Sequence, residues 1–301
     1  MDERTLPPPP SGQPAAEVCY RHANVPTGVH CTRCERPICP DCMNAAPVGH
    51  HCPTCVAEAR QEFRRGPGRR IAIANAKATS VTSLILVAIS AMFLLESVTD
   101  RDLGSAVPAE IAAGQWWRLL SSIFLHGGVV HLLLNGWSLY IFGPVIERIF
   151  GRTRMLVFFL VAGFVGSVAS YAIPPAGPSM VDELFRPSVG ASGALFGLVG
   201  ALLVHSYRRR DSAVGRQFLQ WAIMIIVLNL FIGFSVPRID NLAHIGGAIG
   251  GAACAAVAEL LGRRKSLERA GYAAIVVVGV AVAALQTAAI RETFPQIAGL
   301  L

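Results

Sequence analysis

The chain has 301 residues, of which 53% are hydrophobic and 15% are charged, whereas a soluble domain usually carries about 25% charged residues. Its formal net charge is +7, but the arginines lie beside apolar runs, where they are typical of membrane-topology signals rather than of a nucleic-acid surface. The composition therefore argues against a soluble protein and against a nucleic-acid partner, and in favour of contact with membrane lipid.

The first segment, residues 1–16, is polar and contains four consecutive prolines, Pro7 to Pro10. It has neither the apolar core nor the cleavage pattern of a signal peptide. Because it offers so little apolar surface to bury, we expect a short disordered tail here.

Residues 17–57 contain seven of the eight cysteines, arranged in four pairs with two residues between the partners. The pairs are Cys19 and His22, Cys31 and Cys34, Cys39 and Cys42, and Cys52 and Cys55. Eight soft ligands suit two tetrahedral zinc ions. Disulfides are the alternative, but seven cysteines cannot all pair, and the cytoplasmic side on which we expect this module is reducing. A module of about 40 residues also has too small a core to fold without such ions.

The short gap between the second and third pairs resembles a cross-brace zinc finger of the B-box kind. This resemblance implies that one ion is held by Cys19, His22, Cys39 and Cys42, and the other by Cys31, Cys34, Cys52 and Cys55. Sequential pairing along the chain remains open. A closed site has no free coordination position, so both ions are expected to be structural. A cytoplasmic protein is a candidate partner of the module.

A basic linker follows over residues 58–77, and the chain is membrane-like from there to its end. A helix that crosses a bilayer needs about 20 mostly apolar residues. The predicted spans are Ala78–Leu95, Val129–Ile149, Met155–Ile173, Val189–His205, Phe218–Phe234, Leu242–Leu261 and Ala270–Ala289. We therefore predict an all-α polytopic membrane protein, with a six-helix core in residues 78–262 and an additional transmembrane helix and short tail in residues 263–301.

Groups of arginine and lysine alternate with these spans in a way that fixes the topology. Four such groups share one side of the membrane and lie within residues 64–77, 148–154, 208–216 and 263–269. Because loops rich in these residues stay in the cytoplasm, we predict a multi-pass protein of the cell membrane. Its N-terminus is expected inside, and its C-terminus outside.

The outer loop over residues 96–128 is long and half apolar, and it includes Trp116 and Trp117. A fully solvated loop would not carry these side chains. We expect a segment that lies in the membrane interface, with the tryptophan pair at headgroup level; an ordinary surface loop is the alternative.

Four polar side chains stand near the outer ends of predicted spans, where polar groups are costly and often functional. They are His131, Asn135, Ser192 and His244. At 1.5 Å per residue they lie roughly 3–10 Å below the outer surface, and the spacing of His131 and Asn135 places both on one helix face. Three helices can therefore present them to one cavity.

Each of these residue types has a place in acyl transfer. A serine hydroxyl needs a base, histidine is the usual base at neutral pH, and the developing oxyanion needs donors. No carboxylate lies at the same depth in these spans, so we infer a dyad of Ser192 and His244. Small residues such as Gly247 and Gly251 allow close helix packing, and Phe196 is placed to stack on the His244 ring. Taken alone, each feature is also typical of ordinary helix packing.

The chain resembles the rhomboid family of intramembrane serine proteases over about residues 78–262. The matching motifs, in family order, are Trp117-Arg118, His126, His131-x-x-x-Asn135, Glu147-x-x-x-Gly151, Gly190-x-Ser192-Gly193 and Ala243-His244-x-x-Gly247-x-x-x-Gly251. None departs from the family pattern at a catalytic position.

The resemblance implies a six-helix core with Ser192 as nucleophile, His244 as base, and His131 and Asn135 at the oxyanion positions. It further implies a water-filled cavity open to the outer face, no cofactor for catalysis, and single-pass membrane proteins as substrates, cut in or near their transmembrane segments. Other matched positions, Trp117, Arg118, Glu147 and His126, are structural in the family.

Two other classes of function compete with a protease. A binding or trafficking protein on the same scaffold would not need Ser192. A transporter would be expected to show paired broken helices and charged residues at mid-membrane, and neither is evident in these spans.

Overall fold

The protein is described here by a computed structural model, in which the chain forms two compact units, Met1–Ala78 and Thr79–Leu301. The structure describes residues 17–46, 48–65, 80–172, 180–236 and 239–296. The predicted tail, residues 1–16, and the predicted linker beyond residue 65 lie outside the described residues.

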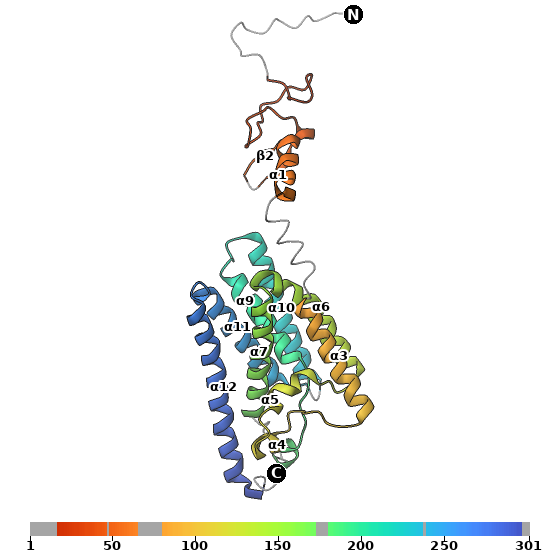
Figure 1. The fold of residues 1–301 in the computed structure, drawn as a ribbon, viewed down its shortest axis with the longest axis vertical. Coiled ribbons are helices and arrows are strands. Elements are labelled where there is room, and N and C mark those ends of the chain that lie inside the picture. Colours follow the sequence, from red (N-terminus) through yellow and green to blue (C-terminus); the bar gives the residue numbers. More distant parts are fainter. Residues whose placement is uncertain (1–16, 47, 66–79, 173–179, 237–238, 297–301) are drawn as a thin grey trace, which may run out of the picture. The chain divides into compact units, whose positions relative to one another are not determined.

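The N-terminal unit consists of short elements (Figure 1). They surround a group of buried cysteines. These elements are η1 (Pro40–Cys42), β1 (Asn44–Ala45), β2 (His50–His51), which pairs antiparallel with β1, and α1 (Pro53–Arg65). Ile38 is the one buried residue of this core, among those described, that is not a cysteine. So little apolar surface cannot hold a fold of this size together. Helix α1 also runs past residue 57, so the first part of the predicted linker is helical.

The second unit is helical, and a helix occupies each of the seven predicted spans. The helices are α3 (Val81–Thr99), α6 (Val129–Phe150), α7 (Arg152–Ala172), α9 (Ser192–Tyr207), α10 (Ala213–Ser235), α11 (Asn241–Leu261) and α12 (Lys265–Thr293); a short helix, α8 (Met180–Leu184), precedes α9. Among the described residues, six helices are long and apolar enough to cross a membrane, whereas α9 has only 16 residues. The predicted all-α polytopic class is confirmed.

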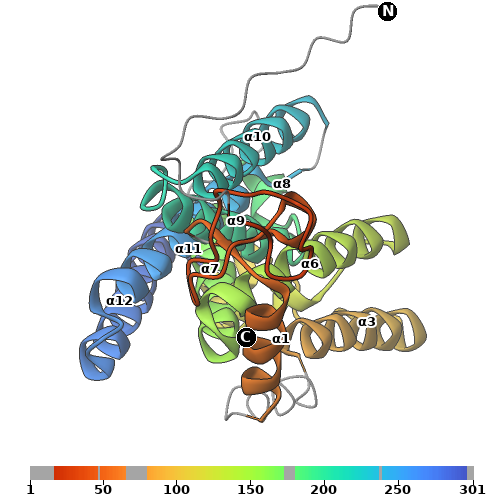
Figure 2. The ribbon, with the colours of Figure 1, turned by 90° about the horizontal axis from the view of Figure 1, so that it is seen from above.

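Helices α7, α9 and α11 form the centre of this unit. Helices α3 and α6 lie together on one side of it, and α10 and α12 each lie on a different side (Figure 2). Every residue of α9 from Gly193 to Leu202 is buried. Glycines allow this density, because a Cβ atom on Gly247 would collide with the carbonyl group of Gly193, and one on Gly251 with that of Gly197. Helices α9 and α11 therefore approach backbone to backbone.

The segment before α6 contains short helices that pack on the core. They are α4 (Pro108–Ala113), α5 (Arg118–Ser121) and η2 (Ser122–Phe124). The buried Arg118 side chain holds the segment together through contacts of 2.6 Å each with Asp102 and Glu110. Burial alone would raise the pKa of Asp102, but the hydrogen bonds from Arg118 and nearby backbone N–H groups lower it.

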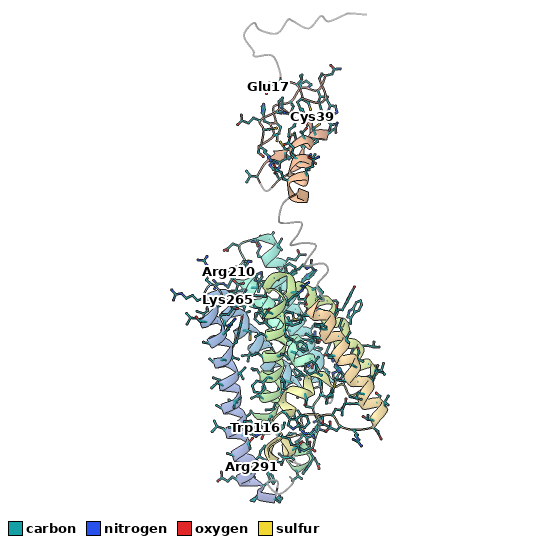
Figure 3. All side chains as sticks on the ribbon, viewed as in Figure 1. Glu17, Cys39, Trp116, Arg210, Lys265 and Arg291 are labelled. Carbon is teal, nitrogen blue, oxygen red and sulfur yellow. The ribbon has the colours of Figure 1, made fainter. Side chains whose placement is uncertain are left out.

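Helix α12 is attached to the core at both ends (Figure 3). Near its start, the buried Glu268 carboxylate accepts hydrogen bonds from Arg154 of α7 at 2.5 Å and from Lys265 at 3.0 Å. Near its end, Arg291 donates to the Ala112 carbonyl of α4 at 2.6 Å. Helix α12 thus braces the segment before α6 against the core.

We expect Gly251→Ala to lower the free energy of unfolding by about 2 kcal/mol, since overpacked sites typically lose that much. The added methyl group would meet the backbone of Gly197, which cannot move away as a flexible side chain could. Thermal denaturation in detergent measures the change, with Gly136→Ala as the control, because its Cβ would lie 3.6 Å from Leu86, an ordinary contact. Equal melting temperatures for the two variants would refute the close approach of α9 and α11.

Candidate active site and metal sites

Ser192 and His244 come together where α9 and α11 begin. The Ser192 hydroxyl and the His244 Nε2 atom lie 2.9 Å apart, which is within the range of a good hydrogen bond. The His244 side chain is buried, with a relative exposure of 8%. A serine hydroxyl bonded to an imidazole nitrogen has the geometry required for an activated nucleophile.

Phe196, one turn below Ser192, fixes the plane of the imidazole ring. Its ring is stacked on that of His244 with 4.2 Å between centroids and 9° between planes, as the spacing predicts. His244 Nδ1 has no hydrogen-bond partner among the described residues. The ring is therefore oriented by stacking and by the Ser192 contact, and not by a carboxylate bonded to its second nitrogen.

The short helix α9 determines the depth of Ser192. Sixteen residues extend over about 24 Å, less than the roughly 30 Å of a bilayer's hydrocarbon core. Ser192 is the first residue of α9, so its backbone N–H is outside the helical ladder and available as a donor. Just before it, Gly190 has φ +132°, a conformation favoured by glycine, and donates to the Ser122 carbonyl at 3.0 Å.

His131 and Asn135 face the same region from α6. The His131 ring packs against the Gly190 backbone. A Cβ atom added to Gly190 would lie 2.8 Å from His131 Nε2 and 3.8 Å from the Ser192 hydroxyl oxygen. Asn135 is buried and donates to the His131 carbonyl at 3.0 Å. Among the hydrogen bonds of the described residues, none joins either side chain to Ser192. The geometry thus brings Ser192, His244 and His131 to one place, whereas the Asn135 side chain bonds within its own helix.

His126 lies beside His131. It is buried, its ring meets that of His131 edge-on at 5.1 Å, and neither ring nitrogen has a partner among the described residues. Burial lowers its pKa to about 4, and the neighbouring His131 adds to this effect. The side chain is therefore neutral at physiological pH and packs as a support for His131.

Asp240 is a residue that the sequence reasoning missed. It lies immediately before α11, and its carboxylate accepts hydrogen bonds from the Ala243 N–H, from Ser170 and from Ser188. This carboxylate belongs to the residue four positions before His244 and lies outside the predicted spans. A possible signal was its position directly before the helix of His244, since aspartate is a preferred N-cap residue.

A small polar cavity adjoins the Ser192 side chain. Its volume is about 20 Å³, enough for one water molecule. Its lining residues include Ser122, Ser167, Ser188, Ser192 and Asp240. The sequence gives no signal for this cavity, because its walls come from four separate segments.

In the N-terminal unit, the eight predicted ligands form two clusters. Within each cluster, the donor atoms all lie within 4.8 Å of one another. One cluster contains Cys19, His22, Cys39 and Cys42, and the other contains Cys31, Cys34, Cys52 and Cys55. The Cys34 and Cys52 sulfurs are 3.7 Å apart, close to the edge of about 3.8 Å of a tetrahedron with zinc–sulfur bonds of about 2.3 Å. None of these cysteines forms a disulfide. Both clusters therefore fit a tetrahedral metal ion.

Comparison with known proteins gives consistent matches to the membrane unit. The Rhomboid domain family matches residues 113–259. Rhomboid protease GluP of Bacillus subtilis is 40% identical over 193 residues, which is 62% of this chain and 36% of that protein. RHOMBOID-like protein 5 of Arabidopsis thaliana is 41% identical over 159 residues, which is 51% of this chain and 47% of that protein.

A further Bacillus subtilis relative, the rhomboid protein YdcA, is 33% identical over 166 residues, which is 55% of this chain and 76% of that protein. The chain thus spans only about a third to a half of the length of the first two relatives. The residues that match the Rhomboid domain family include all four residues of the candidate active site.

Proposed function

Because this chain belongs to the rhomboid family, we propose that it is an intramembrane serine endopeptidase. Its substrates are membrane proteins, single-pass ones among them, whose peptide bonds it hydrolyses in or near transmembrane segments. The observation that carries this proposal is the 2.9 Å contact between Ser192 and His244 across two helices of a multi-pass membrane protein.

The reaction proceeds in two halves. His244 Nε2 accepts the proton of the Ser192 hydroxyl as its oxygen attacks the substrate carbonyl carbon, and it then gives that proton to the leaving amine. In the second half, His244 takes a proton from a water molecule that attacks the acyl-enzyme, and returns it to Ser192 as the carboxylic product leaves. Both halves use one base, so a dyad suffices.

Negative charge develops on the substrate carbonyl oxygen in each half. In this proposal three donors stabilise it: the Ser192 backbone N–H at the start of α9, the His131 ring and the Asn135 amide. Preorganised donors in a water-poor site stabilise such an oxyanion strongly. Asn135 exchanges its bond to the His131 carbonyl for one to the oxyanion.

The charge distribution favours one orientation in the membrane. Arg210 and Lys265 lie at one end of the helical unit, whereas Trp116 lies at the other end (Figure 3). Basic residues favour the cytoplasmic side and tryptophan the interface. The N-terminus is therefore cytoplasmic in this proposal, and the active site opens to the outer side with the C-terminus.

The N-terminal unit binds two structural zinc ions in the cross-brace arrangement. Supporting this are the soft ligand sets, their tetrahedral spacing and the lack of any other sizeable core among the described residues of the unit. Zinc supplies folding energy at such closed sites and takes no part in hydrolysis. The module is of the B-box kind and binds a protein partner in the cytoplasm.

Cleavage of a single-pass reporter by the purified full chain in detergent tests the function. We expect two products whose masses place the cut in or near the reporter's transmembrane segment, and no cut by the Ser192→Ala variant, which controls for contaminating proteases. Equal cleavage by both proteins, or an inert wild type against a panel of such reporters, would sink the proposal.

A further inference from the structure

Asp240 makes more contacts than a helix cap requires. One oxygen, Oδ1, accepts from the Ala243 N–H at 2.9 Å, which is the ordinary N-cap interaction for α11. Capping uses that single oxygen. The second oxygen, Oδ2, accepts from Ser170 of α7 at 2.5 Å and from Ser188 at 2.8 Å. One carboxylate therefore joins three segments that lie far apart in the sequence.

Two of these segments carry the dyad. Ser188 lies four residues before Ser192 and is fixed in turn by backbone hydrogen bonds with Ala106, at 2.9 and 3.0 Å. His244 lies four residues after Asp240, and its N–H donates to the Asp240 carbonyl at 3.2 Å. The Asp240 side chain thus connects two segments by hydrogen bonds. One is the segment that precedes Ser192, and the other is the first turn of α11, which carries His244.

The charge of Asp240 also suits the reaction. His244 becomes a cation when it takes the Ser192 proton, and it does so in the first turn of α11. The unpaired N–H groups there carry partial positive charge, which disfavours a cation. A carboxylate at the same helix end offsets that charge, and in a medium of low dielectric the attraction acts over several ångströms.

We infer that Asp240 is a positioning residue of the dyad, which holds the Ser192 segment against the start of α11 and stabilises the imidazolium that forms on His244. This inference rests on the proposed protease function. It assigns Asp240 no contact with substrate and no proton transfer, since its oxygens are bonded to Ala243, Ser170 and Ser188.

The Asp240→Asn variant separates charge from capping, because asparagine is as good an N-cap as aspartate. We expect kcat for the reporter to fall by between about 10-fold and about 100-fold, with KM within about twofold, since the loss is in the reacting geometry and not in substrate binding. The melting temperature should stay close to that of the wild type. The matched control is Asp211→Asn, which changes an exposed aspartate in the turn between α9 and α10.

A second variant, Ser188→Ala, removes the hydrogen bond from residue 188 to Asp240 Oδ2. It leaves the charge of Asp240 and its N-cap bond to Ala243 in place. It should lower kcat as well, by a smaller factor, again with KM unchanged. It keeps the inference testable should Asp240→Asn fold poorly.

The outcomes separate this inference from the function on which it rests. Wild-type kcat in both Asp240→Asn and Ser188→Ala, with an active wild type, would overturn the role of Asp240 alone. A rise in KM at constant kcat would likewise refute it, because that pattern belongs to substrate binding. An inert wild type would remove the protease proposal and this inference with it.

Discussion

Ser192→Ala and His244→Ala are each expected to lower kcat for a membrane reporter by about 10⁴-fold or more, the scale seen when a member of a serine–histidine unit is removed. Alanine at 192 removes the attacking oxygen. Alanine at 244 removes the one side chain, among the described residues, that is bonded to that oxygen, at 2.9 Å. The measurement is kcat from quantified product bands over a substrate concentration series.

The double variant is expected to be no slower than either single variant, because the two side chains act as one unit. Additive losses would mean that Ser192 and His244 act independently, which contradicts a dyad. Ser206→Ala is the matched control, since Ser206 is buried near the opposite end of the same helix α9. It should retain the activity of the wild type.

Removing zinc ligands is expected to unfold the N-terminal unit, since its buried residues are almost all cysteines and structural zinc supplies on the order of 10 kcal/mol of folding free energy. The wild type should hold two zinc ions, measured by elemental analysis, and lose its protection against limited proteolysis in this unit when chelated. Cys254→Ala, in α11, should retain both ions.

Two double variants distinguish the cross-brace from sequential pairing. Cys19 and Cys39 belong to one cluster, whereas Cys19 and Cys31 belong to different clusters. Cys19→Ala with Cys39→Ala should therefore retain more zinc than Cys19→Ala with Cys31→Ala. The reverse order would establish sequential pairing, in which Cys19 and Cys31 share an ion.

Much of the fold follows from local sequence, because the bilayer permits few alternatives. Backbone polar groups must be satisfied within each span, so an apolar run such as Val129–Ile149 predicts a helix, and α6 (Val129–Phe150) differs from it by one residue. The position of His131 and Ser192 near the outer ends of their predicted spans likewise indicates that they lie at one depth. In the structure both lie beside Gly190.

What the sequence did not predict depends on contacts between distant segments. Two of the three bonds of Asp240 involve residues 52 and 70 positions away, and no periodicity links such positions. The same holds for Arg154 and Glu268, which lie 114 positions apart. The extension of α1 to Arg65 was missed because its polar residues resemble those of a linker.

The most direct test of the central claim is covalent labelling with a fluorophosphonate, followed by peptide mass mapping of the full chain in detergent. Such a reagent phosphonylates a serine hydroxyl that a neighbouring base activates. We expect one adduct, on Ser192, in the wild type, and no adduct on Ser192 in His244→Ala. An adduct on a different serine, or equal labelling of Ser192 in the absence of His244, would contradict the assignment of these two residues as nucleophile and base.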